Sequence, residues 1–407
     1  MRISTSQLYD QNIRAIMENQ REMTQTQEAL STGKRINRPS DDPVGAAKVV
    51  RLTEELDNLN QYQRNNDLLK NNLEQQEAVL TGINDSVTRA RTLIIQAGSG
   101  AMSATDQRAI GTEIAQIRDE VIALMNAQNA NGDYIFAGYQ SQTPAFSLNE
   151  ASSGQNVIFN GDSGENQVKL SDGVSVRSTV SGQDLFADVQ GRRTFAITGN
   201  SPGTTVNSAT IEQQSAFDAF SKSNYDAVTP ANNNYELEIL ASGQAQLTNT
   251  GTNTVVETVD FASGTPFTIK GMSFNLNAVT GDTVSFSLDQ PTKTSLPETL
   301  HDLSQILTQS IDGQNIDEAI SDALNGLDNG LEKVALERSS IGGRLNIAES
   351  VYETNLDLEL AAKGARSAIQ DTDYAEASAE FAKQETALNA ALATFPKVTN
   401  LSLFNYI

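Results

Sequence analysis

The sequence predicts an α+β protein of several domains, in which helices at the two chain ends pair and a mostly β domain is inserted in mid-chain. Apolar residues recur with heptad spacing in both outer parts of the chain. The middle differs, because residues 144–295 hold only 22 of the 79 charged residues but 13 of the 27 glycines. With 407 residues, the chain is also longer than one hydrophobic core usually supports.

The composition argues against several classes of protein. A net charge of −23 disfavours nucleic acid or an anionic membrane as the main partner, because phosphates bind basic surfaces. With no cysteine and a single histidine, His301, the chain has no disulfide, no thiolate metal site and no paired-histidine site. We therefore expect no enzyme, no metal and no cofactor, and we expect His301 to be an exposed helix residue.

The two ends each carry half of a coiled-coil seam. Helices are predicted at Ile3–Leu30 and Tyr374–Phe395, and in each an apolar residue recurs every seven positions. The seam positions between these apolar residues are Ile13, Gln20 and Gln27 in the first helix, and Ser378, Glu385 and Leu392 in the last. Such helices are marginal in water alone, so we expect them to pair antiparallel and to become ordered on assembly. The expected assembly interface consists of Tyr9, Ile13, Ile16, Met23, Leu30, Tyr374, Phe381, Leu388, Leu392 and Phe395.

A joint between two helices is predicted in the stretch LSTGKRINRPSDDPVGAA, residues 30–47. Gly33 can end the first helix, and Asp42 before Pro43 is a helix start with Asp as the N-cap. Asp41 and Asp42 are therefore expected to be caps rather than metal ligands. The expected interdomain joint consists of Gly33, Arg35, Asn37, Asp41, Asp42 and Pro43.

Residues 43–143 and 296–366 are expected to form a helical core domain, because heptad seams run through both. One such seam comprises Leu73, Leu80, Ile83, Val87, Ala90 and Ile94. A β-hairpin is expected near Tyr134–Tyr139. Together with a terminal coiled-coil domain of residues 1–42 and 367–407, this leaves 144–295 as the inserted, outward-facing domain.

Strand signals are concentrated in this insert. Tyr235–Leu240 alternates apolar and charged residues, as expected for a half-buried strand. Asn160-Gly161 and Asp172-Gly173 are dipeptides that favour hairpin turns. Residues 144–295 are therefore interpreted as a β domain.

Several of these motifs resemble the flagellin family. The joint, with LSTGKRIN followed by DDP-x-G-A, is similar to the family's N-terminal joint, and RSSIGGRLN at 338–346 resembles its C-terminal flank. Residues 367–376 and 400–407 resemble the start of the last helix and the closing residues. Residues 132–146 are similar to the segment before the insert in hook-associated members. Pro396 departs from the family pattern, and we expect the last helix to end near Phe395 or to kink there.

The resemblance implies a non-enzymatic structural adaptor of the bacterial flagellum, which joins hook-associated protein 1 (FlgK) to the flagellin filament. It further implies a ring of subunits of this chain, and unfolded export through the flagellar type III channel without a cleaved signal peptide. The implied export chaperone is FlgN. Three alternatives remain: a flagellin filament subunit, a surface adhesin or glycan-binding protein that acts through the β domain, and an enzyme within the insert, for which the sequence offers no nucleophile–base pair.

Overall fold

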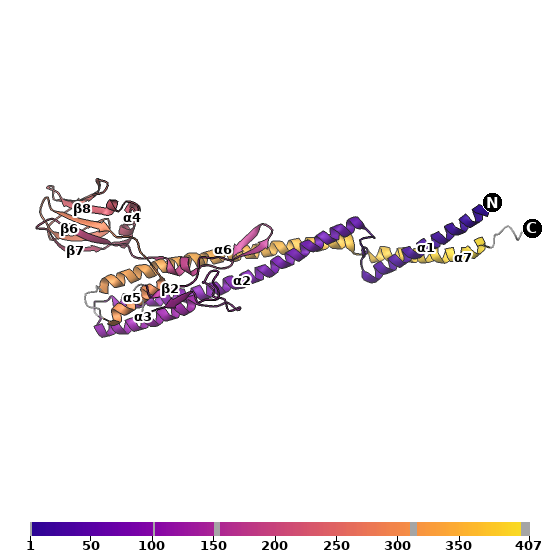
Figure 1. The fold of residues 1–407 in the computed structure, drawn as a ribbon, viewed down its shortest axis with the longest axis horizontal. Helices are drawn as coiled ribbons and strands as arrows, with labels where there is room; N and C mark the ends of the chain where they lie inside the picture. Colours follow the sequence, from indigo (N-terminus) through magenta and orange to yellow (C-terminus); the bar gives the residue numbers. More distant parts are fainter. Residues whose placement is uncertain (1, 101, 150–154, 310–315, 400–407) are drawn as a thin grey trace, which may run out of the picture. The chain divides into compact units, whose positions relative to one another are not determined.

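The computed structural model describes residues 2–100, 102–149, 155–309 and 316–399 (Figure 1). The fold is α+β, with helices toward both ends of the chain and strands in the middle, and so the predicted class is confirmed. The chain divides into two compact units. The first comprises Met1–Lys70, Val168–Val176 and Leu345–Ile407, and the second comprises Asn71–Gln167 and Arg177–Arg344.

Four helices contribute to the first unit: α1 (Arg2–Thr32), α2 (Pro43–Ala97), α6 (Ile316–Gln370) and α7 (Tyr374–Thr399). Within this unit α1 lies along α7 in the antiparallel sense (Figure 1). The early part of α2 lies along the late part of α6, where the Asn66 amide donates to the Ala348 carbonyl oxygen at 2.7 Å. None of the helices in the described part of the chain is long and apolar enough to cross a membrane.

The last helix does not end near Phe395, because α7 continues through Pro396 to Thr399. Proline removes one backbone N–H, whose acceptor would be the carbonyl of Leu392. In the last turn of a helix this costs a single hydrogen bond, so the helix tolerates it. The closing motif, residues 400–407, lies outside the described residues.

A β-hairpin also lies in the first unit, apart from its first and last residues. It consists of β3 (Gln167–Ser171) and β4 (Val174–Arg177), joined at the predicted Asp172-Gly173 turn. Side-chain amides of Asn65 in α2 and Asn355 in α6 donate to the carbonyl oxygens of Lys169 and Leu170, each at 2.8 Å. These strands were expected to be part of the outward β domain, but they lie on the helices.

The second unit has a helical core in which α3 (Ala104–Met125) packs on α5 (Leu296–Gln309). A Cβ on Gly111 would lie 2.8 Å from the Cβ of Leu307, so the two helices approach closely. The predicted seam is confirmed, since its members are fully buried: Leu73, Leu80, Ile83, Val87, Ala90 and Ile94.

Two predictions in this helical part are wrong. His301 is buried, because α5 packs on α3 and the Arg118 guanidinium donates to His301 Nδ1 at 2.7 Å. Tyr134–Tyr139 forms no strand pair, since turns fill it and the only ladder contact described there is a single bridge between Gln128 and Tyr134. Gly132 and Gly138 both have positive φ, a conformation that belongs to turns rather than to an extended ladder.

The remaining strands form two larger antiparallel sheets. The five-stranded sheet has the order β10-β9-β8-β13-β6, and the three-stranded sheet has the order β11-β12-β7. The strands are β6 (Phe195–Asn200), β7 (Thr205–Ile211), β8 (Asn234–Ile239), β9 (Gln244–Asn249), β10 (Thr254–Asp260), β11 (Phe267–Ile269), β12 (Met272–Asn277) and β13 (Thr283–Leu288). Helix α4 (Gln214–Asn224) completes their core with Phe217 and Phe220.

Short elements precede and follow these sheets. β1 (Phe146–Leu148) pairs with β2 (Val157–Phe159), and β5 (Val189–Gln190) pairs with β14 (Lys293–Thr294). A single π-helical turn spans Gln183–Ala187, and a 3₁₀ turn spans Pro230–Asn233. The described strands before β6 do not join either larger sheet, so the three-domain division at 144 and 295 stays a prediction.

Candidate functional site

The first helix ends at a glycine that the joint requires. Gly33 has φ +71°, and its N–H donates to the Ala29 carbonyl oxygen at 2.9 Å, as in a helix C-cap. A Cβ at this position would lie 2.9 Å from the Tyr374 hydroxyl oxygen at the start of α7. Both the backbone conformation and the available space therefore favour glycine.

The joint pairs two segments that lie far apart in the sequence. The Arg35 N–H donates to the Gln370 carbonyl oxygen at 2.7 Å, and the Thr372 N–H donates to the Gly33 carbonyl oxygen at 3.0 Å. The Arg35 guanidinium adds a bond to the Ile369 carbonyl oxygen at 2.8 Å. The passage from α1 to α2 is thus tied to the passage from α6 to α7.

Both aspartates of the joint cap backbone N–H groups, as predicted. Asp41 accepts hydrogen bonds from the N–H groups of Arg38 at 2.9 Å and of Asn37 at 3.2 Å. These bonds hold the pKa of the Asp41 carboxyl below its usual value, and the bond from Arg38 has the largest effect. Asp42 accepts from the Gly45 N–H at 2.9 Å and is the N-cap of α2, with Pro43 as its first residue.

The sequence reasoning assigned no role to Ile36, although this buried residue fills the centre of the joint. A Cβ on Gly45 would lie 2.6 Å from the Ile36 Cδ1 atom, so a glycine at 45 leaves room for the isoleucine. The G of the DDP-x-G-A pattern is the sequence signal that points to this contact.

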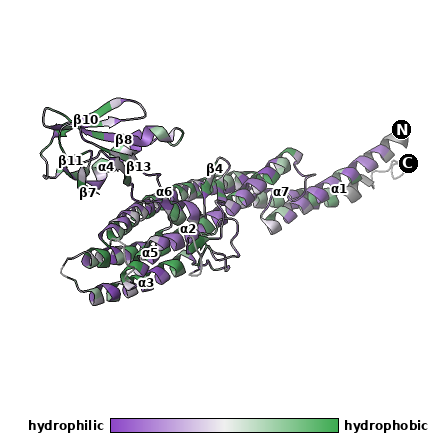
Figure 2. Ribbon diagram, turned by 60° about the vertical axis from the view of Figure 1, so that its left-hand side comes forward, coloured by the Kyte–Doolittle hydropathy of each residue, from purple (hydrophilic) through white to green (hydrophobic). Residues whose placement is uncertain are grey.

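The pair of α1 and α7 buries only part of its apolar surface. Six of the predicted interface residues are half-buried: Ile13, Ile16, Met23, Leu30, Phe381 and Leu388. Tyr374 and Leu392 keep 58% and 52% of their surface exposed. The backbones of Tyr9 and Phe395 lie in α1 and α7, and their side chains are outside the described part. Green and purple residues are interspersed along both helices in Figure 2.

Apart from the exposed Tyr374, the described heptad residues of the seam are half-buried as predicted, but most of the covered positions between them lie one residue before the predicted ones. The partly covered positions between the heptad residues are Asn12, Asn19 and Thr26 in α1, and Ala377, Gln384 and Ala391 in α7. Gln20, Gln27, Ser378, Glu385 and Leu392 are instead exposed. The most buried side chain of α7 among the described residues is polar, since Gln384 is only 9% exposed and its Oε1 atom has no hydrogen-bond partner.

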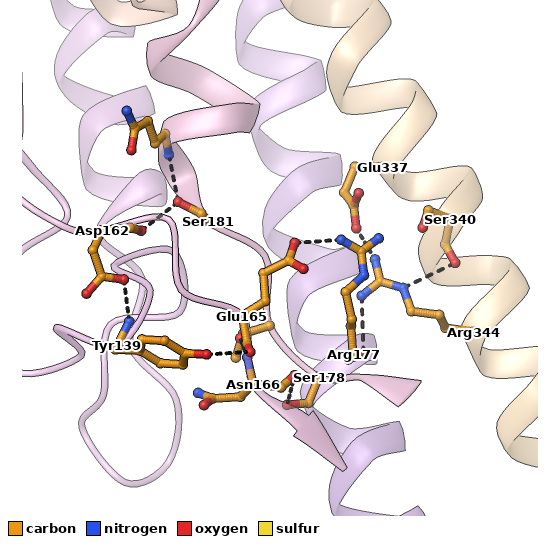
Figure 3. Close-up of polar contacts among 12 residues, drawn as sticks. Tyr139, Asp162, Glu165, Asn166, Arg177, Ser178, Ser181, Glu337, Ser340 and Arg344 are labelled. Carbon is orange, nitrogen blue, oxygen red and sulfur yellow. Dashed lines mark hydrogen bonds and ion pairs between the residues drawn. The ribbon is translucent and has the colours of Figure 1, made fainter. Parts of the chain in front are cut away.

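A polar cluster in the second unit is the alternative candidate for a site (Figure 3). Arg344 is paired with Glu337 and donates to the Arg177 carbonyl oxygen at 3.3 Å, while the Arg177 guanidinium donates to Glu165 at 2.5 Å. Burial raises the pKa of Glu337 and lowers the pKa of Arg344. Each of these charges has a partner, so the cluster has a structural role in fastening Arg177 to α6.

A cavity of about 800 Å³ lies in the second unit, and His301, Asp302 and Arg192 are among the residues that line it. Desolvation by the surrounding protein raises the pKa of Asp302 to about 6 although part of the residue stays exposed, and the charge of Glu298 adds to this shift. Arg192 is paired with Asp322 and with Glu318. In the described part of the chain, no three His, Cys, Asp or Glu side chains are grouped so as to hold a metal ion.

Comparison with known proteins finds a family model that matches the joint and α1. Residues 3–141, which contain α1, the joint, α2 and α3, match the model of the bacterial flagellin N-terminal helical region. The N-terminal third of this chain is thus similar to the N-terminal helical region of bacterial flagellins.

Similarity to whole proteins is illustrated by two relatives. The flagellar hook-associated protein 3 of Salmonella typhimurium is 36% identical over 146 residues, which cover 36% of this chain and 46% of the relative. Flagellin FlaB1 of Treponema pallidum is 34% identical over 131 residues, which cover 32% of this chain and 43% of the relative. The match thus spans less than half of each relative.

A solved structure extends the similarity of the fold. The flagellar hook-associated protein 3 from Legionella pneumophila aligns with a TM-score of 0.56 at 21% identity, over 78% of this chain and 97% of that structure. At this identity the likeness shows the fold alone.

Proposed function

We propose that this chain is a structural adaptor of the bacterial flagellum at the junction between hook and filament, and that it has no enzymatic activity. The observation that carries the proposal is the pair of α1 and α7, which the joint closes at one end and which leaves Tyr374 and Leu392 more than half exposed. The resemblance to proteins named hook-associated protein 3 supports the location.

The proposed mechanism is addition of the terminal pair to a growing tube. Burial of one large apolar side chain contributes about 1.5–3 kcal/mol, offset by the entropy lost when the helix ends become ordered. A seam that is only half-buried keeps the single chain soluble, and the next subunit supplies the missing contacts. The assembly interface in this proposal is the set of ten residues from Tyr9 to Phe395 named above, and Gly33–Pro43 is the joint to the helical core.

The proposed partners are hook-associated protein 1 (FlgK) on one side, flagellin on the other, and further copies of this chain in a ring. We propose export through the flagellar type III channel with the chaperone FlgN, and a final location at the hook–filament junction outside the cell. The three domains in this proposal are 1–42 with 367–407, 43–143 with 296–366, and 144–295.

A flagellin filament subunit is the second candidate, favoured by the 34% identity to flagellin FlaB1 over 131 residues. The two are distinguished by adding sulfate to the purified protein, because sulfate strengthens apolar burial. Electron microscopy and sedimentation then show the product. Long filaments would mean a filament subunit. A protein that stays short, caps hook–basal preparations and then accepts flagellin supports the junction adaptor.

A further inference from the structure

The late part of α6, within the first unit, presents an apolar face that nothing in the described chain covers. Leu356 and Leu360 are 41% and 73% exposed and lie one turn apart on the same side of the helix, whereas Leu358, which is 48% exposed, lies on the other side with Ala361 and Ala365. Only Asn355, Glu359 and Ala362 are buried in this segment. We call the side of α6 that carries Leu356 and Leu360 the α6 face. Neighbouring exposed leucines on one side of a helix are a candidate for a protein contact.

Two acidic side chains lie on the same side of the helix as Leu356 and Leu360. Glu353 and Asp357 are exposed, and at 100° per residue Glu353 falls between Leu360 and Asp357 around the helix axis. Neither carboxylate has an ion-pair partner among the described residues. The α6 face therefore combines exposed leucines with two unpaired negative charges.

The first two turns of α2, also in the first unit, present a face of opposite charge. Val44 and Val50 are 67% and 59% exposed, and Ala47 is exposed between them. Lys48 and Arg51 lie on this face, are exposed and have no ion-pair partner among the described residues. We call Val44–Arg51 the α2 face.

The two faces cannot meet within one chain. In the first unit α2 and α6 pack on each other, as the Asn66–Ala348 and Gln63–Glu359 hydrogen bonds show. A surface of α2 turned to solvent and a surface of α6 turned to solvent therefore point away from their shared contact. Each face needs another molecule to cover it.

We propose that the α6 face of one copy binds the α2 face of the next copy. The apolar side chains match apolar side chains, and Glu353 and Asp357 meet Lys48 and Arg51, so a second copy satisfies both faces at once. Elsewhere a chain of net charge −23 repels its own copies. The contact is heterologous, because two different surfaces meet, and such contacts generate rings or helical assemblies. The proposal rests on the proposed function, because both require several copies of the chain to lie side by side.

The absence of cysteine makes a direct test possible. Val50→Cys and Leu360→Cys are prepared separately, mixed in sulfate, and treated with a short bismaleimide. We expect a covalent dimer in the mixture, with a link between the two different introduced thiols identified by mass spectrometry, and little dimer from either variant alone. Leu68→Cys, at a similarly exposed position on α2, replaces Val50→Cys in the control and should not link.

Two results would overturn the proposal: no link in the mixture, or links only between identical positions. The outcome is independent of the proposed function. If the chain caps hook preparations but does not form this link, the proposed function stands and the proposed contact is wrong. If the chain forms the link but grows long filaments, the proposed contact stands and the proposed junction role is wrong.

Charge reversal sharpens the test. Lys48→Glu with Arg51→Glu should weaken self-association in sedimentation by at least about tenfold, and so should Glu353→Lys with Asp357→Lys. A mixture of the two double variants should regain assembly, because every contact between the two kinds of chain then pairs opposite charges. The chain carrying all four changes should regain assembly for the same reason. Arg64→Glu on α2 is the control, and failure of the fourfold variant to recover contradicts the proposed pairing.

Discussion

The α1–α7 pair and the helical core of the second unit have the same heptad spacing but differ in how much of the seam is buried. In the core, Leu80, Ile83 and Val87 are fully buried. In the terminal pair, Met23 and Phe381 are half-buried, and the seam positions between the heptad residues are polar or small. A heptad pattern therefore predicts that a helix packs against a neighbour. The residues between the heptad positions decide how much of the seam is buried within a single chain.

The largest expected effect of a single change lies in the core. Leu80→Ala should lower the free energy of unfolding by about 2–5 kcal/mol, because it removes a fully buried side chain and leaves a cavity. Urea titration followed by circular dichroism measures the loss. Leu68→Ala, at an exposed position on the same helix, is the matched control and should change little. Equal effects from the two variants would contradict the burial of the core seam.

A smaller effect is expected at the joint. Gly33→Ala should cost about 1–3 kcal/mol, since alanine at φ +71° is strained and its Cβ meets the Tyr374 hydroxyl group. Gly132→Ala is the control, because Gly132 has φ +85° with open space around the missing Cβ. The excess loss at Gly33 in urea titration measures the contact with Tyr374. Adding Tyr374→Phe to Gly33→Ala should recover that excess, and no recovery would disprove the contact.

In the terminal seam we expect little effect on the single chain and a large one on assembly. Phe381→Ala or Leu388→Ala should leave the β domain folded and shift the urea midpoint only slightly, because both side chains are already half exposed. Incorporation at the flagellar tip should be abolished. Val228→Ala, at a 90% exposed position in the β region, should leave incorporation intact. Normal filament growth with either seam variant would refute the assembly interface.

The smallest expected effect is electrostatic and belongs to the second unit. The folded state raises the pKa of Asp302 from 3.8 to about 6, so the folded chain holds this proton more tightly than the unfolded chain. The contribution of Asp302 to stability is therefore present below pH 4 and is lost as pH rises through about 6. Asp302→Asn should flatten this part of the pH dependence in thermal unfolding. Because the Asp302 side chain still reaches solvent, the change is small, and identical profiles for both proteins would contradict the shift.

The joint and the helical seams could be predicted because their signals are local. Asp42 before Pro43 fixes the start of α2 whatever surrounds it, and the core seam is apolar at every step. The phase of the terminal seam could not be predicted, because four-three and three-four steps from Phe381 are equally possible and neither Gln384 nor Glu385 is apolar. Burial of His301 depends on α3, which lies 183 residues earlier along the chain at Arg118.

The β3–β4 hairpin shows a further limit of local signals. Its turn was predicted from Asp172-Gly173, but its position on the helices was not. The residues that hold it there are single asparagines, Asn65 and Asn355, in otherwise ordinary helix sequence. One polar side chain in a long helix does not indicate what it binds.

The pairing across the joint also sets a time order for folding. Arg35 binds the Ile369 carbonyl 334 residues further along the chain. At the usual rate of synthesis of about 5–20 residues per second, the ribosome needs roughly 17 to 70 s to make that partner. Throughout this interval α1 has no helix to pair with, and its half seam is open to any other apolar surface nearby. The joint is thus among the last contacts that a newly made chain can close.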